Sequence, residues 1–119
     1  MVLSEKTYDL IVLRRDLSSQ SAAYAMPDRS FVGEIYSYLK YIQASGDDLC
    51  GIGDTERILS VISNKFSDAN LCKVRVALDA LIEHKLVSKS SDGKITVVPA
   101  ETKVDLFTAP TLKYIADFL

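Results

Sequence analysis

The chain has 119 residues, of which 48% are hydrophobic and 25% charged, a composition that fits one globular domain and argues against disorder. Its net charge of −2 and pI near 5.3 argue against a general, strongly basic DNA-binding protein. There is no leader pattern, and no apolar run reaches the ~18 residues that a membrane helix needs. We therefore expect a cytoplasmic protein without membrane association.

Two segments precede the first predicted helix. Thr7–Arg14 is a short apolar run in which polar and apolar residues do not alternate, so it predicts a strand buried on both faces. Asp16–Pro27 is rich in Ser and Ala and ends at a proline, which predicts a linker. We therefore divide the chain into residues 1–27, an N-terminal strand and linker, and residues 28–119, the main domain.

Three helices are predicted next. The first begins after Asp28, which can act as its N-cap, and runs to about Ala44. The second is Asp54–Phe66, and the third is about Ala69–Lys85, capped by Ser67 or Asp68. The third has the strongest helical period in the chain, which places on one face Leu71, Val74, Leu78, Leu81 and Ile82. We expect this face to pack on the two preceding helices.

The segments Leu86–Ser90 and Lys94–Pro99 flank an Asp92-Gly93 turn and predict a two-stranded hairpin. Residues 100–107 are expected to be extended, and Thr108 to cap a last helix with Pro110 in its first turn. A helix-turn-helix followed by a hairpin is the plan of a winged-helix domain. The predicted fold class is therefore α+β and winged-helix-like, with an extra N-terminal strand and a C-terminal helix.

Residues with catalytic or metal-binding chemistry are sparse. The single histidine, His84, has no Cys or His at metal-ligand spacing, and we expect it to be a solvated surface residue near a helix end. Asp47 and Asp48 are expected to be solvated loop charges, with a catalytic or metal site as the alternative. Cys50 and Cys72 are expected to be free thiols in a reducing compartment, with one disulfide as the alternative.

The nucleic-acid hypothesis depends on the cations of the third helix and the hairpin. The outward positions of that helix carry charges that nearly cancel, namely Lys73, Arg75, Asp79, Glu83 and Lys85. We predict weak phosphate contacts, each by a point charge, from Lys73, Arg75, Lys89 and Lys94; an ordinary solvated surface is the alternative. Four such contacts with a single strand predict a salt slope of about −2.8 on a log–log plot.

Several short motifs occur in a familiar order. They are Tyr8-Asp9-Leu10-Ile11-Val12-Leu13, Met26-Pro27-Asp28-Arg29 before Ile35-Tyr36-Ser37-Tyr38-Leu39, the run Lys73–Leu81, and Lys103-Val104-Asp105-Leu106 before Ala109-Pro110-Thr111. Together they span most of residues 7–114, and the pattern resembles the C-terminal region of RecJ-type single-stranded-DNA-specific exonucleases. Two features depart from that family: Ala109 replaces a frequent Ser, and the linker Ser18–Ala25 is short.

The resemblance implies a non-catalytic accessory domain of a 5′–3′ exonuclease in DNA repair, which positions single-stranded DNA or docks a repair protein. The family's nuclease centre uses Asp- and His-rich motifs with Mn²⁺ or Mg²⁺. This chain matches none of those motifs, so we expect no catalytic residue, metal ligand or cofactor in it. On this hypothesis the chain is a severed C-terminal domain. The alternatives are a free-standing winged-helix regulator that reads duplex DNA and a protein-docking structural domain.

Overall fold

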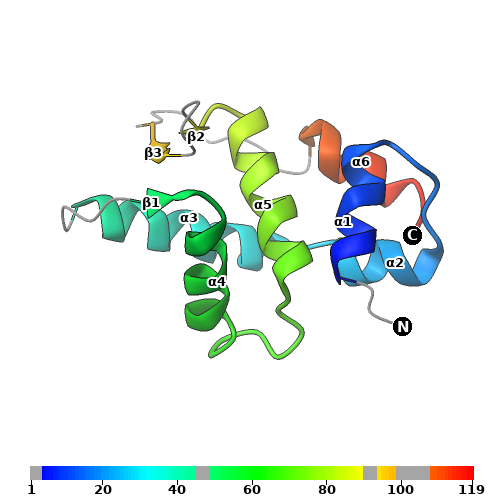
Figure 1. Cartoon of the computed structure of the whole chain (residues 1–119), viewed down its shortest axis with the longest axis horizontal. Helices are drawn as coiled ribbons and strands as arrows, with labels where there is room; N and C mark the ends of the chain where they lie inside the picture. The colour runs from blue at the N-terminus through cyan, green and yellow to red at the C-terminus, as the bar shows by residue number, and fades with distance from the viewer. Residues whose placement is uncertain (1–3, 45–48, 90–93, 99–107) are drawn as a thin grey trace.

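The computed structural model describes residues 4–44, 49–89, 94–98 and 108–119. Within these ranges the chain forms an α+β fold with six helices and one small sheet (Figure 1). The helices are α1 (Ser4–Val12), α2 (Ser19–Ala25), α3 (Arg29–Ala44), α4 (Gly51–Ile62), α5 (Leu71–Glu83) and α6 (Pro110–Ala116). The strands are β1 (Leu49–Cys50), β2 (Val87–Lys89) and β3 (Lys94–Val97).

The predicted strand and linker at the N-terminus are both wrong, because these segments form helices α1 and α2. A short apolar run does not by itself distinguish a strand from a helix. In α1, Tyr8 and Ile11 lie one turn apart and both belong to an apolar cluster that includes α5. In α2, the Ser18 hydroxyl accepts a hydrogen bond from the Ser21 backbone N–H at 3.1 Å and so caps the helix.

The predicted helices α3 and α5 are confirmed. Asp28 accepts a hydrogen bond from the Phe31 backbone N–H at 2.8 Å, as expected of the N-cap of α3. The N-cap of α5 is Asn70, which accepts from the Lys73 N–H, rather than the predicted Ser67 or Asp68. The helix α4 begins and ends earlier than the predicted Asp54–Phe66.

The sheet has the strand order β1-β3-β2, and both pairings are antiparallel. The predicted hairpin is confirmed by β2 and β3, in which Val87 pairs with Val97 and Lys89 with Ile95. Its turn at Asp92-Gly93 and the segment 99–107 lie outside the described residues. The strand β1 is too short to cover β3 completely, so the Gln43 side chain accepts from the Val97 N–H at 2.7 Å beyond its end.

The last helix, α6, has Pro110 in its first turn as predicted, but its N-cap is Ala109 and not Thr108. Ala109 provides no side-chain hydrogen bond, and the cap comes instead from a residue on α5. The Glu83 carboxylate accepts from the Thr111 N–H at 3.1 Å and from the Thr111 hydroxyl at 2.8 Å. A carboxylate placed at a helix N-terminus is stabilising, so this contact fixes α6 to the end of α5.

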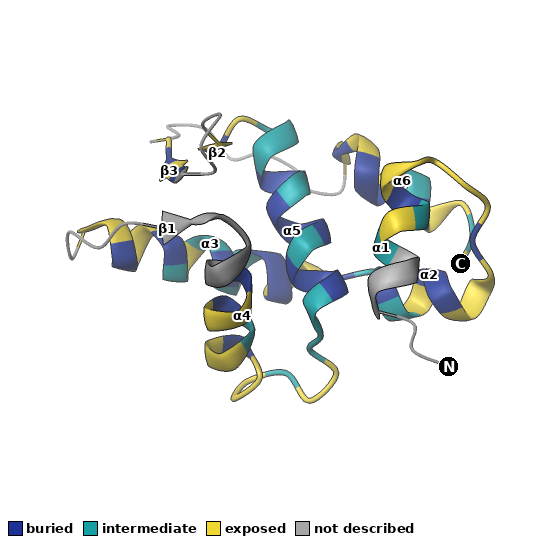
Figure 2. Cartoon of the chain, viewed as in Figure 1, coloured by how far each residue is buried: buried dark blue, intermediate teal, exposed yellow. Residues whose placement is uncertain are grey.

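Two apolar clusters share α5. The first lies between α3, α4, α5 and the sheet, and it includes the predicted inward face of α5 at Val74, Leu78 and Leu81. The second lies between α1, α2, α6 and the opposite side of α5, where Cys72, Val76 and Ala80 contribute. Figure 2 shows buried residues along the whole length of α5, whereas α3 and α4 carry exposed outer faces.

Candidate binding recess

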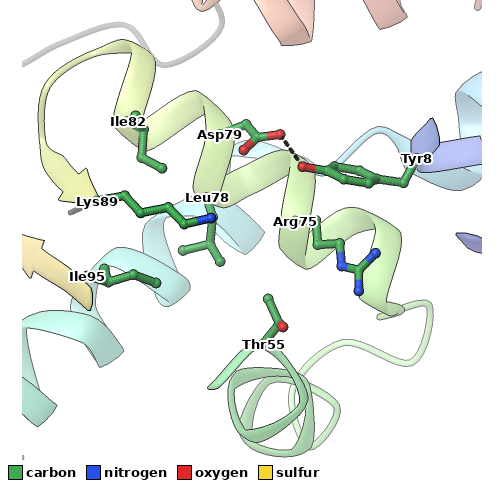
Figure 3. A pocket seen from close by; sticks show the side chains of 8 residues that line it. All are labelled: Tyr8, Thr55, Arg75, Leu78, Asp79, Ile82, Lys89 and Ile95. Atoms are coloured by element: carbon green, nitrogen blue, oxygen red, sulfur yellow. Dashed lines mark hydrogen bonds between the residues drawn. The ribbon is translucent and has the colours of Figure 1, made fainter. Parts of the chain in front are cut away.

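One strip of α5 is left partly open between the two clusters. It carries Arg75, Asp79 and Ile82, which are spaced three or four residues apart and are all half-buried. The strip forms the base of a recess of about 220 Å³. Helix α1 borders the recess on one side, and α4 and the hairpin border it on the other (Figure 3).

The recess combines an apolar floor with polar groups from four elements. Its apolar lining is Leu78 and Ile82 from α5, Ile95 from β3 and the ring of Tyr8 from α1. Its polar lining is Arg75 and Asp79 from α5, Lys89 from β2 and the buried Thr55 from α4. Such a concave apolar site with a few polar groups is typical of a ligand pocket.

A hydrogen bond between Tyr8 and Asp79 forms one wall of the recess. The Tyr8 hydroxyl donates to Asp79 Oδ2 at 2.8 Å and joins residues 71 positions apart in the chain. Burial raises the pKa of Asp79 above its ordinary value, although the hydrogen bond from Tyr8 opposes this shift. Burial and the adjacent Asp79 carboxylate also raise the pKa of Tyr8. Tyr8 therefore stays a neutral donor, and Asp79 keeps its second oxygen, Oδ1, as a further acceptor.

Two cations reach the recess from different elements. The Arg75 guanidinium lies over the Tyr8 ring, 5.3 Å from its centroid, in a cation–π contact. The exposed Lys89 extends from β2 toward the middle of the recess, where Figure 3 draws its ammonium group at Leu78, and Arg75 lies farther toward Tyr8. Neither cation forms an ion pair within the described part of the chain. Both charges are therefore available to an anionic ligand.

Of the three predicted phosphate-binding residues whose side chains the structure describes, Arg75 and Lys89 lie together at the recess and Lys73 does not. The prediction of an outward Lys73 is wrong, because its side chain is only 7% exposed and its Nζ lies 2.8 Å from Asp68 Oδ2. Lys73 lies near the start of α5, where its side chain turns back to the preceding loop. Lys94 begins β3, and its side chain lies outside the described part of the structure.

Sequence reasoning missed Tyr8, Thr55 and Asp79 as members of the recess. The apolar run around Tyr8 predicts a strand, and a strand there gives no reason to place Tyr8 against α5. The helical pattern predicts an outward Asp79, whereas Asp79 is half-buried and bonded to Tyr8 of α1. The one available signal was a carboxylate beside the apolar stripe of α5, next to Leu78, because such groups require a partner when they are buried.

A second recess, of about 240 Å³, lies beside the first. Asp79 and Ile82 line both recesses, and the second is completed by Ile11, Val12, Arg14, Glu83 and Thr111. The end of α1 here exposes apolar side chains, since Val12 is 57% and Leu13 64% exposed. Glu83 is already used by α6, so this recess offers fewer free polar groups than the first.

The other candidate residues lie away from the recess or outside the described part of the chain. His84 is the C-cap residue of α5 and is partly exposed, near a helix end as predicted, and its Nε2 lies 3.2 Å from the Thr108 hydroxyl oxygen. Cys72 is a free thiol, as expected, and burial raises its pKa to about 12. The Cys50 side chain and residues Asp47 and Asp48 lie outside the described part. Over the described ranges, no cluster of three or more metal-ligating side chains occurs, and no helix could span a bilayer.

Comparisons with known proteins return no match among protein-family models, curated proteins or solved structures. The resemblance to the C-terminal region of RecJ-type exonucleases therefore stays a prediction from the short motifs of the sequence. A functional proposal for this chain depends on the recess itself: the two cations, the Tyr8–Asp79 wall and the apolar floor.

Proposed function

We propose that the chain is a winged-helix-like, non-catalytic accessory module of a RecJ-type exonuclease, and that it holds single-stranded DNA along the α5 recess. The order of elements supports the winged-helix assignment: a helix (α3), a short strand, two helices and a hairpin whose second strand pairs with the short one. The motif resemblance supports the assignment to an exonuclease. The recess supplies the surface on which a strand would lie.

The observation that favours single-stranded over duplex DNA is the enclosure of α5. A helix that reads duplex DNA enters a major groove about 12 Å wide, and a helix with its side chains already spans about 10–12 Å. Such a helix must project from its domain. Here α5 is packed between two apolar clusters, and its open strip lies at the base of a recess. A flexible single strand can enter such a recess, whereas a helix that is bordered by α1 and the hairpin does not project as a groove-reading helix does.

The number of available cations sets the expected strength of binding. Among the residues that the structure describes, Arg75 and Lys89 are the cations that line the recess, and Asp79 lines it with them. Two single-strand phosphate contacts give a salt slope of about −1.4, half of that expected from four contacts. The proposed module therefore binds weakly and is suited to positioning a strand that another domain holds.

The test is a titration of fluorescent single-stranded and duplex DNA of the same sequence at several salt concentrations. We expect the single strand to bind more tightly, with a slope near −1.4. Arg75→Ala and Lys89→Ala are each expected to reduce the slope by about 0.7. Lys113→Ala, which removes an exposed charge from α6, is the matched control and is expected to leave the slope unchanged. Tighter binding of the duplex would favour a regulator instead, and absence of binding at low salt would reject both nucleic-acid functions.

A protein-docking role is the second candidate, and the exposed end of α1 favours it. Val12 and Leu13 present apolar side chains beside the second recess, where a partner protein could cover them. If no DNA binds, this surface remains as the basis for function. Val12→Asp and Leu13→Asp would then be expected to abolish partner binding without loss of the fold, because both side chains are exposed.

A further inference from the structure

We infer that the α5 recess receives a single base of the bound strand and selects cytosine over thymine through Asp79, an inference that rests on the proposed single-strand function. The recess is small, with a volume of about 220 Å³, and side chains from α1, α4 and the hairpin border it around the open strip of α5. The proposal therefore assigns one unstacked base to the recess.

The two ends of the recess suit the phosphates on either side of that base. Lys89 reaches in from the hairpin, and Arg75 lies beyond Leu78 beside the Tyr8 ring (Figure 3). Successive phosphates of a strand flank each base, so a base over Leu78 and Ile82 brings one phosphate toward each cation. The aliphatic floor provides apolar contact for the base face, and the Tyr8 ring closes the side next to α1.

Asp79 supplies the selectivity. Its Oδ2 accepts from the Tyr8 hydroxyl, which holds the carboxylate in place, and Oδ1 remains able to accept from a ligand. A carboxylate accepts well from the N4 amino group of cytosine, whereas thymine presents the acceptor O4 at the same position. The two pyrimidines are similar in size, so this difference in hydrogen bonding separates them. Glu83, the nearest other carboxylate along α5, is engaged by Thr111 and does not compete for the base.

The test compares a short deoxycytidine oligomer with a thymidine oligomer of equal length, at low salt and mildly alkaline pH so that Asp79 is ionised. We expect the intact chain to bind the cytidine oligomer about tenfold to a hundredfold more tightly, the difference that one added hydrogen bond to a charged group provides. An oligomer of N4,N4-dimethylcytosine, which lacks the donor hydrogens, is expected to bind no better than the thymidine oligomer. This arm uses the unaltered chain and does not depend on the folding of a variant.

Asp79→Asn gives the complementary arm. The amide oxygen can still accept from Tyr8, while the amide N–H now meets the base and favours the O4 of thymine. The cytidine preference is expected to disappear or reverse. The control Glu56→Gln makes the same chemical change at an exposed position on α4 and is expected to keep the preference.

The possible outcomes separate this inference from the function on which it rests. Equal binding of the cytidine, thymidine and dimethylcytosine oligomers would overturn base selection and leave the single-strand function standing. A cytidine preference that persists in Asp79→Asn would also overturn the inference, because another group would then be responsible. Absence of binding to every oligomer would overturn both proposals.

Discussion

Lys73 illustrates how burial changes the role of a single charge. The helical pattern predicts that Lys73 points outward, yet its side chain is buried and its ammonium group pairs with the exposed carboxylate of Asp68. Removing one member of an ion pair is costly when the charge left behind is buried, but here that charge is Asp68, whose side chain is 72% exposed and can be hydrated, while the buried ammonium is lost. Lys73→Met is therefore expected to keep the free energy of unfolding within about 1 kcal/mol of the intact chain, or to raise it, and to leave DNA affinity unchanged. Urea unfolding and DNA titration measure the two effects. A several-fold loss of DNA affinity would contradict this prediction and show that Lys73 contributes to DNA binding.

Asp68 gives a pH-dependent prediction at the same pair. The hydrogen bond and charge of Lys73 lower the pKa of Asp68 below its ordinary 3.8. A carboxyl group with a depressed pKa in the folded state adds stability above the unfolded-state pKa and loses it as pH falls through the folded-state value. Asp68→Asn is therefore expected to be less stable than the intact chain at neutral pH. The difference is expected to close below pH 3.8. Urea titrations of both proteins across this pH range test the prediction. If the difference in the free energy of unfolding does not change with pH, the ion pair is not the cause of that difference.

At the scale of elements, α5 ends in a backbone conformation that its sequence does not favour. Lys85 has a φ of 61°, the left-handed region that glycine occupies most readily. The Leu86 N–H donates to the Leu81 carbonyl at 3.0 Å, and the Lys85 N–H donates to the Ile82 carbonyl at 2.9 Å. These carbonyl groups at the C-terminal end of α5 are therefore hydrogen-bonded as in a Schellman motif.

Lys85→Gly is therefore expected to stabilise the fold by about 1 kcal/mol, because it removes the steric cost of the left-handed conformation. Lys40→Gly is the matched control: it lies inside α3, where glycine costs about 1 kcal/mol. Thermal or urea unfolding of the two variants is expected to give changes of opposite sign. Destabilisation by both would show that the Lys85 side chain, and not the backbone, determines stability at this position.

The elements that could be predicted are those with strong local signals. The helix α3 has Asp28 as its cap, α5 has a regular apolar stripe, and the hairpin has a turn sequence between two apolar runs. By contrast, α1 and α2 are short, and such helices depend on tertiary packing that local patterns do not report. The same limit applies to the recess. Arg75 and Lys89 could be named from charge alone, but Tyr8 enters the site only because α1 folds back onto α5.

At the scale of the whole molecule, the shared helix α5 couples the two apolar clusters. One face of α5 packs on α3 and α4, and the other packs on α1, α2 and α6. Loss of either cluster would expose an apolar face of the same helix. We therefore expect the chain to unfold in one cooperative transition, in which α1 and α2 are an integral part and not a separable arm.

Leu112→Ala tests this coupling from the side remote from the sheet. Leu112 is fully buried in the second cluster, and truncating such a residue costs about 2–5 kcal/mol. If α5 couples the clusters, amide hydrogen exchange is expected to become faster in α3 as well as in α6, and the free energy of opening is expected to fall by the same amount in both helices. Leu119→Ala, at a side chain that is 62% exposed, is the control and is expected to change little. Faster exchange confined to α1, α2 and α6 would show that the second cluster opens independently. The Tyr8 wall of the recess would then be able to detach while the sheet stays folded, and ligand binding would have to include the cost of closing it.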